Sequence, residues 1–337
     1  MGGTLSISPE QFAVLVNPNA RHVDADVQQR ITEMVDPEHI YVSEHEDDAG
    51  RILEEIVEKG YTTVFAAGGD GTVTSVINQL PDDDASPRVG ILKLGTGNAM
   101  AEMISSGNPM VDLQSYTSNR STDDYQLPLL ECEGTRFAFA GLGIDAFILN
   151  DYRDMKDRYG SGPLKPLLQN VLGYFVAFFA VTIPRFVMRW LRRKRIQVKV
   201  TNLGREAYRV KGDKRGGSEA ERIAPGDVIY EGPVQTVLFG TCPYFGYAMK
   251  TLPFAGIDPE RFHLRVCDIS LAGLVWSLRS LWKGTLRHKK LHDFQVERVL
   301  LQFSEPVPYQ LAGEAMGYRN DVVVGFSGRS VDLVRFI

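Results

Sequence analysis

Cysteine is scarce in this sequence, and the three cysteines lie far apart. Cys132, Cys242 and Cys267 lack the spacing of a zinc site, and their odd number argues against a disulfide framework. We therefore expect reduced structural thiols in a cytoplasmic protein. The first residues of the chain also lack the basic-then-apolar pattern of a secretory signal peptide.

The sequence has no strong excess of one charge. Its net charge is only −5, which argues against a general nucleic-acid-binding protein. Hydrophobic residues make up 44% of the chain and charged residues 23%, which is an ordinary globular composition. The 337 residues exceed the roughly 250–300 at which a single core stops growing, so we expect two domains. This composition does not decide between a monomer and a homo-oligomer.

Long uncharged runs are rare, and residues 166–184 form the main one. Such a run could just span a bilayer, but Gln169, Asn170 and the prolines at both ends argue against a span. Two alternatives are favoured equally over a true span, which also stays open: a helix packed on a sheet and a helix lying in the membrane surface. In the second, the basic residues that follow would contact anionic headgroups. They include Arg192, Arg193, Lys194 and Arg195.

A second stretch, Leu271–Leu291, has apolar residues at helical spacing and basic residues towards its end. We expect an amphipathic helix that packs on a sheet and leaves one face in solvent. The alternative is a basic amphipathic helix that touches lipid. Together the two basic clusters favour a peripheral association with anionic membrane surfaces.

Glycine, in contrast, is plentiful, and it gathers after a short β-branched strand near residues 62–65. The turn that follows reads Gly68-Gly69-Asp70-Gly71-Thr72, and Thr72 or Thr74 can cap the next helix. A strand, a glycine turn and a helix N-terminus together present backbone N–H groups that can bind a phosphate. An acid among the glycines fits a group that holds Mg²⁺ or takes a proton from an attacking hydroxyl. A structural turn with a capping Asp is the alternative.

Two further polar turns follow strands in the same part of the chain. Gly95-Thr96-Gly97-Asn98 follows a predicted strand over 89–92, and Asn17-Pro18 follows one over 12–16. In an open α/β sheet such turns lie at the carboxyl ends of the strands, where ligands bind. We therefore expect the three turns to lie near one another.

The pattern of elements predicts two kinds of domain. Strands and helices alternate over residues 10–110, which indicates a doubly wound α/β domain with a parallel sheet. Residues 114–123 read as a polar linker, and strand-like runs dominate from Tyr125 onwards. We expect an α/β nucleotide-binding domain over residues 1–120 and a β-rich, sandwich-like domain over 121–337.

The three turns resemble the nucleotide-site motifs of the diacylglycerol kinase and sphingosine kinase superfamily of lipid kinases. Gly141-Leu142-Gly143-Ile144-Asp145-Ala146 resembles the segment by which that family enters its second domain, and residues 239–253 resemble a later motif. The resemblance covers nearly the whole chain. It implies an α/β nucleotide domain, then a β-rich lipid domain, with the active site in the cleft between them. NAD kinases share the glycine motif, so the later segments are what favour a lipid kinase.

The resemblance implies phosphoryl transfer from ATP, with Mg²⁺, to a hydroxyl of a diacylglycerol-, sphingoid- or ceramide-type lipid. It makes Asp70 the candidate base or metal-linked acid and places Asp145 at the lipid headgroup. Glu314 is the second candidate catalytic acid, and no Mg²⁺ ligands are assigned. The candidates for ATP phosphate binding are Asn17, Gly68, Gly69, Gly71, Thr72, Gly95, Thr96, Gly97 and Asn98.

The sequence departs from the family pattern at Gln310-Leu311-Ala312-Gly313-Glu314, where the family has Asp-Gly-Glu. Ala312 replaces the acid, whereas Glu314 remains. A catalytically weak homologue that senses nucleotide and membrane is therefore the first alternative function. An NAD-kinase-like small-molecule kinase is the second. Ala99 follows Asn98, as in sphingosine kinases, which leans towards a sphingoid-type substrate.

Overall fold

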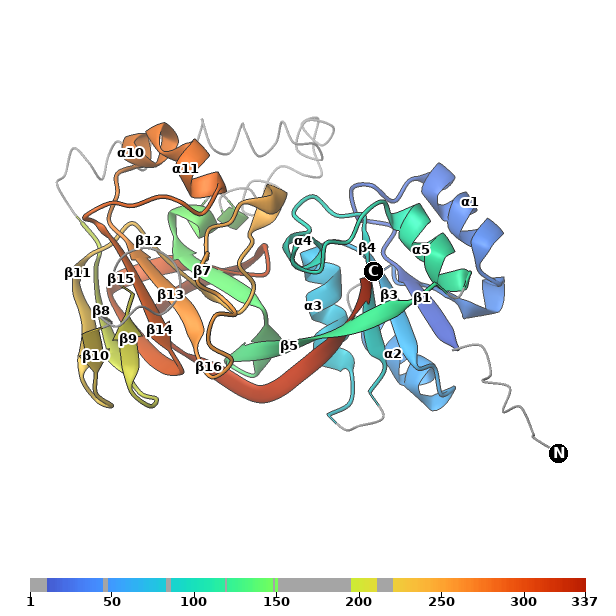
Figure 1. The fold of residues 1–337 in the computed structure, drawn as a ribbon, viewed down its shortest axis with the longest axis horizontal. Helices are drawn as coiled ribbons and strands as arrows, with labels where there is room; N and C mark the ends of the chain where they lie inside the picture. The colour runs from blue at the N-terminus through green and yellow to red at the C-terminus, as the bar shows by residue number, and fades with distance from the viewer. Residues whose placement is uncertain are drawn as a thin grey trace. The chain divides into compact units, whose positions relative to one another are not determined.

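The computed structural model describes residues 11–44, 48–82, 86–118, 120–147, 149–150, 195–210 and 221–337. The uncharged run 166–184 and residues 192–194 lie outside these ranges, so what we expect of them stays a prediction. The chain forms two compact units, which are drawn in Figure 1. Unit 1 comprises Met1–Leu129, Tyr244–Ala248 and Gly328–Ile337, and unit 2 comprises Leu130–Pro243 and Met249–Ser327.

A parallel sheet forms the centre of unit 1. Its strand order is β4-β3-β1-β2, and Leu333 near the end of β16 pairs in parallel with Val89 of β4. All six residues of β3 are buried, as expected for a parallel strand with both faces covered. The strands are β1 (Phe12–Val16), β2 (Ile40–Val42), β3 (Thr63–Gly68), β4 (Arg88–Lys93) and β16 (Glu314–Phe336).

Helices cover both faces of this sheet. Figure 1 shows α1 (Ala25–Met34) and α5 (Pro109–Thr117) on one face, and α2 (Asp48–Glu58) and α3 (Asp70–Gln79) on the other. On the first face, Ile31 of α1 and Leu113 of α5 belong to one buried cluster with Phe65 of β3. The short elements η1 (Pro37–His39) and α4 (Ala99–Met103) complete the unit. The predicted doubly wound α/β architecture is confirmed.

The polar linker expected over residues 114–123 is wrong in its first part, because α5 continues to Thr117. Asn108 caps this helix: its Oδ1 accepts a hydrogen bond from Met110 N at 3.0 Å. Leu113 and Tyr116 are buried, so two apolar side chains anchor an otherwise polar segment. The second domain expected over 121–337 also differs from the observed units, since Tyr244–Ala248 and Gly328–Ile337 belong to unit 1.

Unit 2 is rich in antiparallel strands, as expected. Strand β15 (Arg298–Leu311) pairs with β7 (Phe139–Gly143) through Tyr309–Leu311 and with β8 (Gln197–Asn202) through Val299–Phe303. Its two ends therefore belong to different sets of strands, which is how sandwich-like folds turn a corner. Strand β5 (Thr122–Cys132) belongs to unit 1 up to Leu129 and to unit 2 from Leu130. The other strands of unit 2 are β6 (Thr135–Phe137), β9 (Ala207–Arg209), β10 (Glu221–Ile223), β11 (Val228–Pro233), β12 (Thr236–Gly240), β13 (Phe262–Cys267) and β14 (Leu291–Val296).

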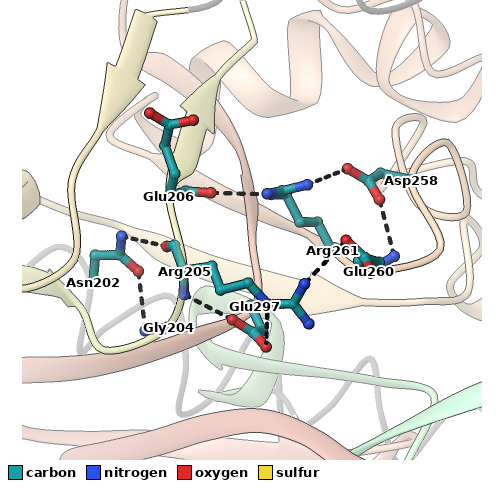
Figure 2. Close-up of polar contacts among 8 residues, drawn as sticks. All are labelled: Asn202, Gly204, Arg205, Glu206, Asp258, Glu260, Arg261 and Glu297. Carbon is teal, nitrogen blue, oxygen red and sulfur yellow. Dashed lines mark hydrogen bonds and ion pairs between the residues drawn. The ribbon is translucent and has the colours of Figure 1, made fainter.

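A polar network holds the loop after β8 to the segment before β13 (Figure 2). Arg205 donates from Nε to Glu297 Oε1 at 3.2 Å and from a terminal nitrogen to Glu260 Oε2 at 3.2 Å. Arg261 donates to the Glu206 carbonyl at 3.0 Å and to Asp258 Oδ2 at 2.6 Å. Arg205 and Glu260 are mostly exposed, so we expect their ion pair to add little stability.

The single amphipathic helix expected over Leu271–Leu291 is wrong. The chain instead forms two short helices, α10 (Leu271–Trp276) and α11 (Leu278–Trp282), separated at Ser277. Gly284 has a φ of +69°, and the basic residues from Lys283 to Lys290 lie in a loop, whereas Arg279 lies in α11. Neither helix has a fully buried residue.

Two further expectations concern cysteine and membranes. All three cysteines are free and buried, in agreement with their expected role as reduced structural thiols. Among the helices of the described ranges, none combines the length and the apolarity that crossing a membrane requires.

Candidate functional site

The glycine turn after β3 leads directly into a helix. Helix α3 begins at Asp70, and its N-cap residue is Gly69, which has no side chain to cap with. The prediction that Thr72 or Thr74 caps this helix is therefore wrong, because both lie inside it. Thr72 Oγ1 instead accepts a hydrogen bond from Asn17 Nδ2 at 3.0 Å, which ties the turn after β1 to the turn after β3.

The second glycine turn packs directly on the first. A Cβ added to Gly95 would lie 2.2 Å from the Cα of Gly69, a separation that no real side chain tolerates. Leu94 N also donates to the Gly68 carbonyl at 3.1 Å, as a continuation of the β3–β4 pairing. The two turns thus approach each other through their backbones, and glycine is required at this contact for steric reasons.

Asp70 links the same two turns through its carboxylate. Its Oδ2 accepts a hydrogen bond from Ala99 N at 2.8 Å, and its Oδ1 accepts one from Met100 N at 3.0 Å. These amides are the first two of α4, so Asp70 stabilises the start of that helix. The side chain is buried, and this burial raises the pKa of Asp70 to about 6 against the opposing effect of the two amides.

Asn98 shapes the end of the second turn. It has a φ of 51°, in the left-handed region that asparagine tolerates better than most residues. Its Oδ1 accepts from Gly95 N at 3.0 Å, and its Nδ2 donates to the Gly95 carbonyl at 2.7 Å. Thr96 between them is exposed, whereas Gly95 and Asn98 are buried. The turn is therefore closed by its own asparagine.

A contact that the sequence did not predict joins this turn to a distant segment of the same unit. Tyr247 N donates to the Gly97 carbonyl at 3.1 Å, from the short helix η3 (Gly246–Ala248). Tyr247 has a φ of 59°, and its side chain is 55% exposed. The presence of Gly246 in the later motif pointed to this segment, but no local pattern assigned it to unit 1.

The other charged residue near the second turn is already paired. Lys93 forms an ion pair with Glu102 of α4, and both side chains are about one-third exposed or less. Unit 1 thus brings together Asn17, Gly68–Thr72 and Gly95–Asn98, as predicted for the three turns.

Asp145 lies in unit 2, directly after β7. Its Oδ1 accepts from Thr236 Oγ1 at 2.7 Å, and its Oδ2 accepts from Gln310 Nε2 at 3.1 Å. Burial raises the pKa of the Asp145 carboxyl above its ordinary value, although both hydrogen bonds oppose that shift. Side chains from β12 and β15 therefore fix the orientation of this carboxylate.

The segment that departs from the family pattern is the hairpin between β15 and β16. Ala312 and Gly313 have φ values of 48° and 87°, and positive φ at both central residues is typical of a type I′ turn. Asp, Asn and Gly adopt this conformation more readily than Ala. Gln310 Oε1 accepts from Gly313 N at 2.9 Å, so one glutamine holds both the hairpin and Asp145. Glu314 is exposed as the first residue of β16.

The described ranges contain no group of three or more His, Cys, Asp or Glu side chains that could hold a metal ion. The side chains of these ranges therefore offer no complete metal site of their own. A Mg²⁺ that binds through nucleotide phosphates needs only one or two carboxylates. Asp70 is the buried carboxylate at the two glycine turns, and each of its oxygens accepts one hydrogen bond from a backbone amide. The donor set therefore fits such an ion.

Comparisons with known proteins point to one family. Residues 11–125 match the model of the diacylglycerol kinase catalytic domain. A protein named "Probable lipid kinase YegS-like" from Enterobacter sp. (strain 638) is 40% identical over 98 residues, which cover 28% of this chain and 32% of that protein. A diacylglycerol kinase from Staphylococcus haemolyticus is 38% identical over 58 residues, or 17% of this chain and 18% of that one. The chain thus aligns with less than a third of the length of these relatives.

The fold similarity extends further than the sequence similarity. A crystal structure of a diacylglycerol kinase from Bacillus anthracis str. Sterne superimposes with a TM-score of 0.63 and covers 97% of both chains at 17% identity. At that identity the match shows a shared fold only. The match to the diacylglycerol kinase catalytic domain is thus confined to residues 11–125, whereas the similarity of fold covers nearly the whole chain.

Proposed function

We propose that this protein is an ATP-dependent lipid kinase that phosphorylates a hydroxyl group of a diacylglycerol- or sphingoid-type lipid. The observation that carries the proposal is the pair of glycine turns that Asp70 joins within a diacylglycerol kinase catalytic domain. The names of the relatives, a lipid kinase and a diacylglycerol kinase, support the choice of a lipid over NAD as the acceptor.

The ATP phosphates are assigned to the amides of the two turns and of the helix N-terminus at α3. Gly69 and Gly71 are half-buried, so a ligand can reach their backbones without displacing a side chain. Thr96 is exposed at the tip of the second turn, and Asn17 holds Thr72 from the side of β1. Mg²⁺, when bound with the nucleotide, supplies neutralisation of phosphate charge.

Asp70 is the proposed base. In the reaction the lipid hydroxyl oxygen bonds to the γ-phosphorus, the bond from that phosphorus to the ADP oxygen breaks, and the hydroxyl proton passes to Asp70. A pKa of about 6 leaves this carboxylate ionised at neutral pH and close to the value that suits proton transfer. A Cβ on Gly97 would lie 3.0 Å from Asp70 Oδ2, so any larger residue at this position would crowd that oxygen.

In unit 2, we propose that Asp145 contacts the lipid headgroup and that Glu314 orients it. Asp145 is half-buried and held by two side-chain hydrogen bonds, which suits recognition of a hydroxyl or amine, while Glu314 is exposed. Peripheral binding to an anionic membrane surface is part of the same proposal, because the acceptor is a membrane lipid.

Ala312 favours one alternative, a weak or inactive kinase that senses nucleotide and membrane. The position has a positive φ that aspartate adopts readily, so Ala312→Asp restores the family residue without backbone strain. If this change raises an otherwise barely detectable transfer activity, the natural protein is a degraded kinase.

The test is incubation of the purified protein with γ-labelled ATP, Mg²⁺ and separate acceptors. The panel contains diacylglycerol, sphingosine, ceramide and phosphatidylglycerol in neutral detergent micelles, and NAD in solution. We expect label in one of the lipids and none in NAD. Label in NAD alone would contradict the lipid-kinase proposal and favour an NAD kinase. Absence of label from all acceptors would favour the inactive homologue that senses nucleotide and membrane.

A further inference from the structure

Helices α10 and α11 lie at one end of the strands of unit 2 (Figure 1). They carry several exposed large apolar side chains. Trp276 is 94% exposed and Val275 is 64% exposed, both at the end of α10. Leu278 and Trp282 of α11 are 45% and 41% exposed. Exposure of single apolar residues is ordinary, but two tryptophans and two aliphatic residues within eight positions are not.

The helices that carry these side chains are firmly attached to the unit. Leu274 and Leu281 pack against a small buried cluster of Cys267, Ile269 and Leu286. Lys250 N donates to the Trp282 carbonyl at 3.0 Å, which fixes the end of α11. The two helices are therefore fixed to unit 2, and the apolar side chains are exposed in the folded protein.

The segment that contains α10 and α11 carries only positive charges. No Asp or Glu occurs between Asp268 and Asp293, whereas the segment contains five Lys and Arg residues. Lys290 pairs with Asp268 at 3.3 Å, and Arg287 lies over the ring of Phe254 at 5.5 Å. Among the described residues, no carboxylate pairs with the exposed residues Arg279, Lys283 and Lys289. This local excess contrasts with the net charge of −5 for the chain.

We propose that α10, α11 and the basic loop that follows form a docking element for an anionic lipid bilayer. The apolar side chains Val275, Trp276, Leu278 and Trp282 enter the interfacial region, where tryptophan is enriched in membrane proteins. Arg279, Lys283 and Lys289 contact lipid phosphates, as in other basic amphipathic membrane-surface elements. A second copy of this chain is a poor occupant, because the symmetric contact would place these cations against their own copies.

This inference rests on the membrane binding in the proposed function and names the surface that makes the contact, and docking is measured separately from catalysis because the assay contains no nucleotide. Wild-type protein is sedimented with phosphatidylcholine vesicles that contain or lack phosphatidylserine. We expect binding to the phosphatidylserine vesicles that weakens as salt is added, because the charge contribution is screened. The apolar variant W276S/L278S and the charge variant R279Q/K283Q/K289Q should each bind at least tenfold more weakly.

The matched control is Y318S/V323S, which removes two 40% exposed apolar side chains at other positions of unit 2. It should bind as the wild type does. All variants are first checked by circular dichroism, and their melting temperatures should stay close to that of the wild type because the replaced side chains are exposed. A charge variant and an apolar variant that both bind normally would overturn the proposal.

Tryptophan fluorescence tests insertion directly. The chain has three tryptophans, so W190F/W282F leaves Trp276 as the only one. Its emission should shift to the blue on anionic vesicles and be quenched by brominated lipids. Bound protein without shift or quenching would contradict insertion, and a wild-type dimer that the apolar variant converts to monomer would assign the face to a second copy instead. Vesicle binding with no lipid label in micelles would refute the kinase and leave docking intact.

Discussion

Replacement of Asp70 by asparagine is expected to lower the turnover of lipid phosphorylation by about 10²–10⁴-fold, the usual contribution of a positioned general base. The variant keeps the volume of the side chain but cannot accept the hydroxyl proton. It also has only one oxygen for the amides of Ala99 and Met100, so we expect a loss of about 1–3 kcal/mol of stability. Turnover is measured with γ-labelled ATP, and stability by urea unfolding.

Asp112 supplies a matched control for that stability loss. It is also buried in unit 1, and its Oδ2 accepts from Gly107 N and from Ser106 Oγ, each at 2.9 Å. We expect Asp112→Ala, which removes both of these hydrogen bonds, to lower stability by at least as much while turnover falls only slightly. If the two variants lose turnover equally, Asp70 acts only as a structural link between the turns.

The pH dependence of the wild type separates the same two roles. The pKa of Asp70 is raised to about 6, so the carboxylate is ionised above that pH and protonated below it. As a base it is active only when ionised. The value of kcat/KM should therefore fall as the pH drops through about 6. A profile that stays flat from pH 7.5 to about 5, with folded protein throughout, would contradict the proposed base.

Removal of the Asp293 charge is expected to destabilise the protein by about 3–5 kcal/mol, the typical result of breaking a buried ion pair. Asp293 accepts from Arg265 Nε at 2.6 Å and from His263 Nε2 at 2.9 Å. Arg265 is only 1% exposed, so Asp293→Asn leaves an unpaired guanidinium inside unit 2. Urea unfolding followed by circular dichroism measures the change.

The control for Asp293 is the exposed pair of Arg205 and Glu260 in Figure 2. Glu260→Gln should cost less than about 1 kcal/mol, because solvent screens this pair. Equal losses in the two variants would show that burial does not govern these interactions.

The sign of the pH effect at Asp293 follows from its lowered pKa. Arg265 and His263 hold the pKa of this carboxyl well below its ordinary value of 3.8, against the effect of burial. The stability that the ionised Asp293 contributes to the folded protein is therefore fully present above the ordinary pKa of 3.8. This stability is lost as the pH falls towards the lowered pKa. Wild type should lose more stability than Asp293→Asn does below about pH 4.

The parts of this fold that were predictable are those with local patterns. The strand, glycine turn and helix at Gly68–Thr72 follow from adjacent residues, and so does the alternation of strands and helices in unit 1. The end of helix α5 was predicted as a linker because residues 114–117 are mostly polar, although Asn108-Pro109 is a recognisable helix start. The break at Ser277 was missed because the apolar spacing continues across it into α11.

What could not be predicted depends on contacts between distant residues. The sequence suggested an acid at position 70 for catalysis, but it could not show that Ala99 and Met100 bind that carboxylate. The bond from Tyr247 to Gly97 joins residues far apart in the chain. Arg265 and Asp293 form a buried pair only because β13 and β14 are neighbours in a particular register.

The central claim is that ATP phosphates bind at the two glycine turns. Hydrogen exchange, measured with and without a non-hydrolysable ATP analogue and Mg²⁺, tests it most directly. We expect new protection at the amides of residues 68–72 and 95–98 in the wild type and in Gly107→Ala, where an added Cβ meets only an ordinary contact at 3.5 Å. Gly95→Ala should lose this protection, because its Cβ would collide with Gly69. Protection by the bound analogue elsewhere, with none at either turn, would contradict the account.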